Sequence, residues 1–395
     1  MIFKTAVCGL AQRVIETAPS ATVLIADIAA EMRRGGANVI DFSAGRAVEH
    51  TPDYITQAAA AAMLAGDTHQ TPARGKPEFL RACAAKLKRD NDIDIDADKN
   101  IIATLGCKQG LTLALLAIIN PGDEVIVEDP CFVSYAPTIR FCGGVPISIP
   151  LKRENDFRWT GGDLEAAVTE RTRAILFCSP HNPTGTVHAE ADLERIAVVA
   201  ERHNLFVIAD EIYERVTWGG RRHNSIAAQP RMRNRAVGLM GLTKSFAMGG
   251  WRIGFAYAAE PIIEAMTIVQ QHLMTCAGAF TQTGAATALG DAPPLEVTEL
   301  WRDWEKRCQY AVARLDEISG ISCRMPEGGF YAWADITQTG EKSAALAERL
   351  LREQAVAVVP GSAFGAEGEG YLRITCVKSL EDLQIGIEGI KRGLS

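Results

Sequence analysis

Short apolar runs alternate with amphipathic stretches through the centre of the chain. The runs are rich in Ile, Val, Leu and Phe without polar alternation, which is typical of strands covered on both faces. Six such runs occupy residues 101–105, 124–129, 174–179, 205–211, 236–242 and 252–258. Helices are predicted between them, including 108–120, which ends at Pro121 and Gly122, and 190–203. This alternation predicts an α/β domain with a largely parallel sheet flanked by helices.

The C-terminal third has a different pattern. A helix is predicted at 295–318, followed by a strand pair interrupted by glycines at 322–336, a helix at 344–354, strands at 356–361 and 371–376, and a last helix at 380–394. We expect a smaller α+β domain made of residues 286–395 and 1–47, beside a large domain at 48–285. The glycine-rich segment 361–370 is expected to be its flexible element, either a lid or a surface loop.

Composition narrows the class of protein. The 395 residues carry a net charge of −7 and 47% hydrophobic residues, with basic residues scattered rather than clustered. This argues against nucleic acid as the main partner, and no apolar run has the length of a membrane span. The start of the chain lacks a signal-peptide core, so a cytoplasmic protein is expected.

The ten cysteines show no Cys-x-x-Cys spacing, and several lie within apolar runs. Free buried thiols in a reducing compartment fit this pattern better than disulfides or a zinc site. The seven histidines show no metal-ligand pairing, and we expect no metal.

Two segments with candidate chemistry directly follow predicted strands, at the carboxyl ends where ligands bind in parallel sheets. Gly106, Cys107 and Lys108 form a small-residue turn at a helix start, which is either an anion site or an ordinary glycine turn. Asn182 lies between two prolines in residues 179–185. Its amide is therefore held for a ligand, unless the segment is only a turn.

Two further segments carry ionisable groups. Asp210 closes a very apolar strand, so its carboxylate needs a partner such as a protonated pyridine ring, unless it only caps a helix. Lys244 lies between an apolar strand and residues 246–251, where apolar surroundings favour a nucleophilic amine over the usual solvated lysine. Arg252 follows eight residues later and is able to grip a phosphate with two N–H groups.

The order and spacing of these motifs resemble the class I/II aminotransferases of the aspartate aminotransferase superfamily, which are fold-type I pyridoxal-phosphate enzymes. The matching segments are GCKQG at 106–110, DPCFVSY at 129–135, SPHNPTG at 179–185, DEIY at 210–213, TKSFAMGGWRIG at 243–254 and YLRIT at 371–375. The resemblance implies a seven-stranded-type sheet, pyridoxal 5'-phosphate as cofactor, and an amino acid and a 2-oxo acid as substrates. It also implies a homodimer with shared active sites.

The resemblance assigns a cofactor role to most of these residues. Lys244 is expected to form the Schiff base and to move the substrate proton. Asp210 is expected to pair with the pyridinium nitrogen. Tyr213 and Asn182 are expected to bind the phenolic oxygen, and Phe132 to stack on the ring. Gly106, Cys107, Lys108 and Arg252 are expected to hold the phosphate.

The substrate carboxylate has its own expected partners. Arg373 is expected to clamp the α-carboxylate as a bidentate pair, next to Asn182 and to the backbone of Gly45.

Four positions depart from the family pattern. Arg46 and Glu49 bring unusual charges near the expected substrate mouth, and either both point to solvent or Arg46 binds an acidic substrate group. Gln70 stands where relatives carry a tyrosine that reaches the partner's cofactor phosphate, in a crossing segment with His69 and Arg74. Gly241 replaces a serine three residues before the lysine.

These departures leave two enzyme functions open. One is an aminotransferase, and the other is a lyase, cyclase or substitution enzyme that begins from the same deprotonation of an amino acid. A third possibility is an effector-binding domain of a transcription regulator. That possibility is disfavoured because fewer than 50 residues precede Gly45 and they contain no basic recognition helix.

Overall fold

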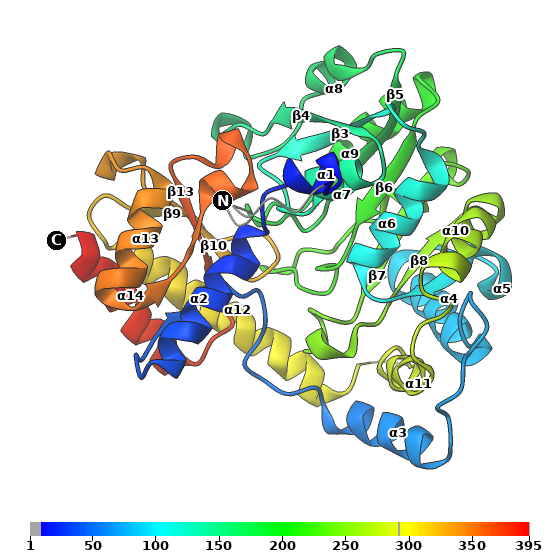
Figure 1. Ribbon diagram of the computed structural model, residues 1–395, viewed down its shortest axis with the longest axis horizontal. Coiled ribbons are helices and arrows are strands. Elements are labelled where there is room, and N and C mark those ends of the chain that lie inside the picture. Colours follow the sequence, from blue (N-terminus) through cyan, green and yellow to red (C-terminus); the bar gives the residue numbers. More distant parts are fainter. Residues whose placement is uncertain (1–8, 291–292, 395) are drawn as a thin grey trace.

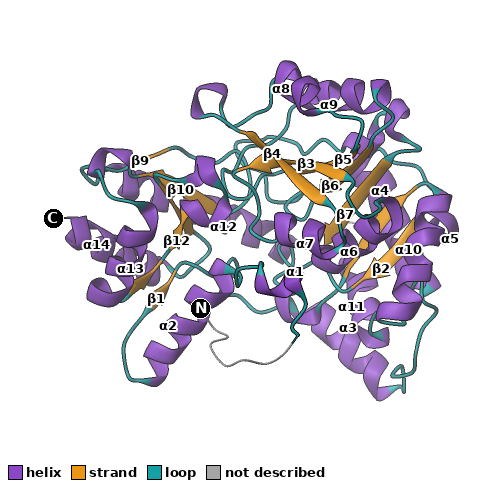
Figure 2. Cartoon of the chain, turned by 45° about the horizontal axis from the view of Figure 1, so that its top comes forward, coloured by secondary structure: helices purple, strands orange, loops and turns teal. Residues whose placement is uncertain are grey.

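The computed structural model describes residues 9–290 and 293–394, and Cys8 lies outside them. A large sheet lies to the right in Figure 1, with helices on both faces, and a smaller sheet lies to the left. Figure 2 shows the large sheet as a twisted central layer.

The large sheet has seven strands in the order β2-β8-β7-β6-β5-β3-β4, as the α/β prediction required. β8 runs antiparallel to both of its neighbours, β2 and β7, and the other neighbouring strands pair in parallel. The strands span Ile101–Thr104 (β2), Glu124–Asp129 (β3), Val145–Pro150 (β4), Thr172–Cys178 (β5), Phe206–Asp210 (β6), Ala236–Gly241 (β7) and Gly254–Ala258 (β8).

Both faces of this sheet are covered, which explains the unbroken apolar runs. In β3, Val125 and Val127 share a core with Leu111 of α6, whereas Ile126 packs with Leu193 of α9. The helices of this part are Asp53–Leu64 (α3), Pro77–Asn91 (α4), Ala97–Asn100 (α5), Cys107–Ile118 (α6), Tyr135–Phe141 (α7), Gly161–Ala167 (α8), Glu190–Arg202 (α9), Glu260–Leu273 (α10) and Ala279–Ala288 (α11).

The smaller sheet is antiparallel, in the order β12-β13-β10-β9. Its strands are Ser322–Cys323 (β9), Tyr331–Asp335 (β10), Val359–Pro360 (β12) and Tyr371–Thr375 (β13), and Ile40–Asp41 (β1) pairs in parallel with Val356–Ala357 (β11). The helices around it are Gln12–Ile15 (α1), Ala21–Arg34 (α2), Leu295–Asp316 (α12), Ser343–Gln354 (α13) and Leu380–Leu394 (α14). The segment near residue 40 is thus joined to the C-terminal part by backbone pairing.

Segment 361–370 differs from the flexible loop that its glycines predicted. It folds into two 3-10 turns, and Phe364 packs edge-on against Trp333. The carboxylate of Asp129 accepts hydrogen bonds from the N–H groups of Ala366 and Glu367, and a Cβ at Gly365 would overlap that carboxylate. The glycines therefore permit close packing.

Cysteines 83, 107, 131, 142, 178, 276, 308, 323 and 376 are free thiols, in agreement with the sequence. Within residues 9–290 and 293–394, no helix is long and apolar enough to cross a membrane.

Candidate active site

The predicted site residues lie where β2, β5, β6 and β7 end and in the small-sheet elements that face them. Gly106 follows β2, Asn182 follows β5, Asp210 ends β6 and Lys244 follows β7. Arg373 lies in β13, on the side of the small sheet that reaches Asn182.

The turn before α6 forms a cationic cradle. Gly106 has a φ of +81°, and a Cβ there would lie 2.9 Å from Nη2 of Arg252. Arg252 Nη2 donates to the carbonyl of Leu105 at 2.9 Å, which holds the guanidinium beside the start of the helix. Lys108 lies near the same groups. Desolvation and the positive charges of Arg252 and Lys244 lower its pKa. Free helix N–H groups and converging cations make this a site for an anion such as phosphate.

Asp210 is buried at the end of β6. Tyr135 donates a hydrogen bond from its hydroxyl to Oδ2 at 2.8 Å, and the N–H of Ile212 reaches Oδ1 at 3.3 Å. Burial raises the pKa of Asp210 to about 6, against the lowering effect of Tyr135 and Lys244. A buried carboxylate that lacks a bound cation fits a ligand that brings a protonated nitrogen.

Lys244 points across the site towards the small sheet. Its Nζ donates to the carbonyl of Gly45 at 2.5 Å and lies 5.9 Å from the ring centroid of Tyr213 and 5.8 Å from that of Phe330. The amine is therefore held between a carbonyl and two aromatic faces.

Tyr331 is a site residue that the sequence analysis missed. Its hydroxyl lies 2.8 Å from the hydroxyl of Tyr213, and its ring lies under the guanidinium of Arg373 at 4.2 Å. A Cβ at Gly45 would lie 2.0 Å from this hydroxyl, so only glycine fits there. The sequence gives a weak signal for Tyr331, since it stands in an apolar run after two glycines.

Arg373 is 2% exposed and is the most completely buried cation of the site. Nη1 donates to Oδ1 of Asn182 at 3.1 Å, and Nη2 donates to the carbonyl of Ser43 at 2.7 Å. Its Nε has no hydrogen-bond partner, and no carboxylate among the described residues pairs with the guanidinium. Burying an unpaired cation is costly, so this arrangement is suited to a carboxylate supplied by a ligand.

Phe132 lies beside the cradle, where its ring is 5.5 Å from that of Tyr135 and 5.4 Å from Nζ of Lys108. Cys107 is buried between charged groups, and desolvation and the charge of Asp210 raise the pKa of its thiol. The thiol therefore stays protonated.

Three predicted positions stand apart from this cluster. Gln70 and Arg46 are exposed, and no contact within the described residues joins either side chain to Lys244. Glu49 does not point to solvent, as the sequence analysis favoured. Its carboxylate lies 2.7 Å from Nη1 of Arg307 and accepts a hydrogen bond from Nε1 of Trp304 at 3.2 Å. Long-range pairing with α12 was not visible in the local sequence.

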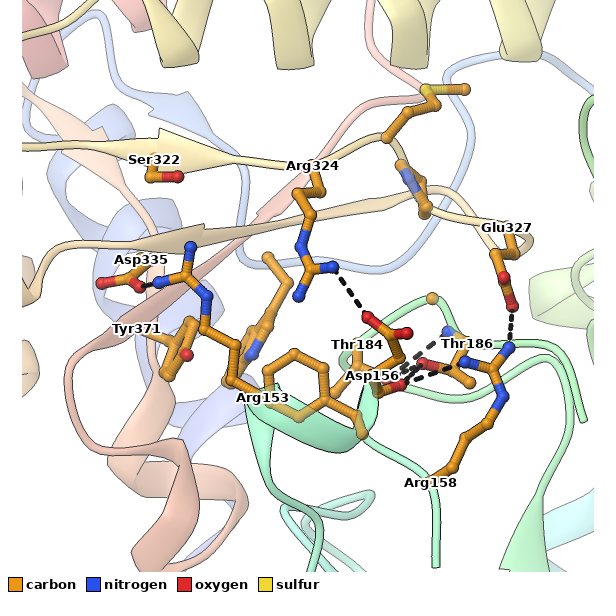
Figure 3. A pocket seen from close by; sticks show the side chains of 15 residues that line it. Arg153, Asp156, Arg158, Thr184, Thr186, Ser322, Arg324, Glu327, Asp335 and Tyr371 are labelled. Atoms are coloured by element: carbon orange, nitrogen blue, oxygen red, sulfur yellow. Dashed lines mark hydrogen bonds and ion pairs between the residues drawn. The ribbon is translucent and has the colours of Figure 1, made fainter.

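A separate cavity of about 180 Å³ lies behind the 179–185 turn. Figure 3 shows that ion pairs line it: Arg324 faces Asp156, Arg158 faces Glu327, and Arg153 faces Asp335. These pairs join the segment after β4 to the small sheet.

Comparisons with known proteins agree with this geometry. The profile of the family "Aminotransferase class I and II" matches residues 37–390. An aspartate aminotransferase of Musicola paradisiaca is 38% identical over 98% of this chain and 97% of its own length. The solved aspartate aminotransferase of Thermus thermophilus with maleate has a TM-score of 0.91 at 34% identity, covering 98% of this chain and 99% of that one. An aromatic aminotransferase of Pyrococcus horikoshii has a TM-score of 0.87 at 39% identity, covering 92% and 98%.

Proposed function

The chain belongs to the class I and II aminotransferases, and we propose that it acts on a dicarboxylic amino acid of the aspartate type. It is a pyridoxal-phosphate-dependent enzyme that moves an amino group between an amino acid and a 2-oxo acid. The choice of substrate and the roles of individual residues belong to the proposal.

The observation that carries the proposal is the buried, unpaired guanidinium of Arg373. Its Nε is buried without a hydrogen-bond partner, Nη1 contacts Asn182, and the guanidinium lies over the ring of Tyr331. A planar α-carboxylate matches a guanidinium with two parallel hydrogen bonds, which an ammonium cannot offer. Arg373 therefore binds and orients the α-carboxylate, and Asn182 and the Ser43 carbonyl hold Arg373.

The residues present fit pyridoxal phosphate. The cradle at Gly106 and Arg252 would take its phosphate, Asp210 would face its ring nitrogen, and Phe132 would cover its ring. When bound, the cofactor supplies an electron-withdrawing ring that makes the substrate's α-hydrogen acidic. Asp210, kept in place by Tyr135, would hold the proton on the ring nitrogen.

Lys244 and the two tyrosines would handle the remaining protons. Nζ of Lys244 lies at the carbonyl of Gly45, beside the α-carboxylate site, where it would remove the α-proton and return it to the neighbouring carbon. Burial raises the pKa of Tyr213 well above its usual value, so its hydroxyl remains a donor that Tyr331 orients.

The side-chain carboxylate would meet Lys108. This lysine lies over Phe132, and its Nζ has no anionic partner among the described residues. Relatives named aspartate aminotransferases and the solved relative with bound maleate, a dicarboxylate, support this choice. The exposed Arg46 is the other candidate cation for the same group.

The oligomeric state, the cellular location and the domain boundaries complete the proposal. We propose a homodimer in which Gln70 reaches the partner's site, since α3 ends in exposed Met63 and Leu64, which is 88% exposed. The nine cysteines of the described residues are free thiols, which supports a reducing, cytoplasmic location. We also propose a large domain at 48–285 and a small domain formed by 1–47 and 286–395.

Single-turnover kinetics of the cofactor-loaded enzyme test the substrate class. We expect aspartate to convert the enzyme at least tenfold more efficiently than phenylalanine, and Lys108→Gln to reduce that preference by about tenfold, since a charged hydrogen bond contributes about 1.5–3 kcal/mol. Arg46→Gln is the matched control and is expected to keep the preference. Loss of the preference only in Arg46→Gln would assign the carboxylate to Arg46, and faster reaction with phenylalanine would favour an aromatic substrate, as in the Pyrococcus relative.

A further inference from the structure

Three ionisable groups lie buried behind the Asn182 turn, and the proposed reaction does not use them. They are Glu128 of β3, His181 beside Asn182, and His188 before α9, and each is at most 2% exposed. Nε2 of His181 lies 3.3 Å from Oε2 of Glu128, and Nε2 of His188 lies 3.5 Å from Oε1. No lysine or arginine pairs with Glu128 among the described residues.

A chain of hydroxyl groups fixes the proton on one nitrogen of His181. Thr186 Oγ1 donates to the carbonyl of Asp156, which can only accept, and Thr184 Oγ1 donates to Thr186 Oγ1. The hydroxyl of Thr184 has then used its only hydrogen, so it must accept at its 2.7 Å contact with Nδ1 of His181. Figure 3 shows Thr184, Thr186 and Asp156 in this chain, at the edge of the ion-pair cavity. The approach of the Thr184 N–H to the same nitrogen, at 3.5 Å, is too long to compete.

The other nitrogen faces the carboxylate of Glu128. With Nδ1 protonated, an unprotonated Nε2 would point its lone pair at the carboxylate oxygen, which is repulsive. A protonated Nε2 would instead point the N–H of a positively charged ring at that oxygen. Oε2 of Glu128 also accepts a hydrogen bond from the N–H of Cys178 at 3.0 Å. Burial lowers the pKa of His188, so that ring remains neutral and leaves the counter-charge to His181.

The backbone of His181 is part of the turn that carries Asn182. The N–H of His181 donates to the carbonyl of Thr186 at 2.7 Å, and the N–H of Gly185 donates back to the carbonyl of His181 at 2.9 Å. A Cβ at Gly185 would lie 2.3 Å from Pro326, so the turn is also seated tightly against the small sheet. The ring contacts Thr184 of this turn on one side and faces Glu128 on the other, so it links Glu128 to the turn that carries Asn182.

We propose that His181 is a positioning residue that, as an imidazolium paired with Glu128, holds Asn182 against the carboxylate clamp Arg373. The inference rests on the proposed function, because it assigns the α-carboxylate to Arg373. Asn182 Oδ1 accepts from Arg373 Nη1 at 3.1 Å, so a displaced turn would release one side of the guanidinium. The effect would appear in carboxylate binding more than in the rate of proton transfer.

The test compares His181→Asn and Glu128→Gln with His188→Gln. Asparagine keeps a donor for Thr184 but cannot reach Glu128, and glutamine at 128 keeps the volume and removes the charge. His188→Gln is the matched control, because His188 approaches the same carboxylate but makes no contact with Thr184 among the described residues. Cofactor-loaded enzyme is titrated with 2-methylaspartate, which has no α-hydrogen and binds without reacting.

We expect His181→Asn and Glu128→Gln to bind 2-methylaspartate about tenfold more weakly, with KM raised by a similar factor and kcat within about threefold of the wild type. His188→Gln should bind within about twofold of the wild type. Spectra of enzyme labelled with ¹⁵N-histidine should show the ring of His181 protonated on both nitrogens at neutral pH, a signal that is absent from His181→Asn and that reports a singly protonated ring in Glu128→Gln.

Unchanged binding in both test variants would overturn the inference, as would equal weakening in His188→Gln or a singly protonated His181 in the wild type. If His181→Asn fails to fold, the affinity of Glu128→Gln for 2-methylaspartate alone decides whether the inference holds. A wild-type enzyme that neither binds 2-methylaspartate nor converts aspartate would instead refute the proposed function. The ¹⁵N spectra would still test the imidazolium in that case.

Discussion

Replacing Asp210 by asparagine should stabilise the apoprotein while disabling the enzyme. Burial raises the pKa of Asp210 to about 6 from an ordinary 3.8. At 1.36 kcal/mol per pH unit, that difference corresponds to about 3 kcal/mol of destabilisation when the carboxylate is ionised. Asparagine still accepts from Tyr135 but loses the contact with the N–H of Ile212, which costs about 1 kcal/mol. A net gain of about 2 kcal/mol remains.

The raised pKa of Asp210 also fixes how the stability of the wild type changes with pH. Because the folded-state pKa is raised, the folded protein binds the proton more tightly than the unfolded chain, and wild-type stability falls as pH rises from about 4 to about 6. Above about 6 the penalty is complete. Asp210→Asn should therefore gain its full advantage at pH 8 and lose it near pH 4.

Chemical denaturation of the cofactor-free proteins, at equal protein concentration and at several pH values, measures this difference. The same variant loaded with cofactor should lose more than about 100-fold in kcat, because breaking a buried ion pair costs about 3–5 kcal/mol. A cofactor-free Asp210→Asn protein that is less stable than the wild type at pH 8 would refute the reasoning. A stability gain independent of pH would also refute it, since only ionisation explains the trend.

Three further predictions concern single contacts. Arg373→Lys should lower kcat/KM for α-amino acids by at least about 100-fold in steady-state assays, because an ammonium cannot form the bidentate pair. Gly45→Ala should abolish measurable turnover because its Cβ would overlap the Tyr331 hydroxyl, and Tyr331→Phe in the same chain should restore part of it. Burial raises the pKa of Glu214, but Lys86, 2.6 Å away, and a nearby arginine lower it to about 2. Glu214→Gln should therefore cost about 3 kcal/mol at pH 7 in denaturation experiments, a loss that shrinks as pH falls from about 4.5 towards 2.

Strands covered on both faces were predictable because burial leaves a continuous apolar run. The six predicted runs correspond to β2, β3, β5, β6, β7 and β8. The seventh strand, β4, was missed because it lies at the sheet edge, where five of its six residues are not buried and two are prolines. An edge strand needs no apolar run, so its sequence resembles that of a loop.

The site was predictable where its residues stand in short motifs after strands. Gly106, Asp210 and Lys244 stand at or just after the ends of β2, β6 and β7, so the strand pattern locates them. Tyr331 meets Tyr213 across a sequence separation of 118 residues. Glu49 likewise finds its partner on α12, more than 250 residues away. Such contacts depend on how the two sheets face each other, which no local pattern records.

Three charged groups of the site share one property: each lacks a partner of opposite charge within the described residues. Arg373 is a buried cation without an anion, Asp210 is a buried anion without a cation, and Lys108 is a cation with no anionic partner among the described residues. In contrast, the buried charges of Lys86 and Glu214 are paired with each other. Unpaired charges lower stability, and each is complementary to one group of the proposed ligands: an α-carboxylate, a protonated ring nitrogen and a side-chain carboxylate. The affinity of the site for the proposed ligands therefore comes from charges that the fold leaves unpaired. The folded protein should be stabilised most when the bound ligands together supply all three groups.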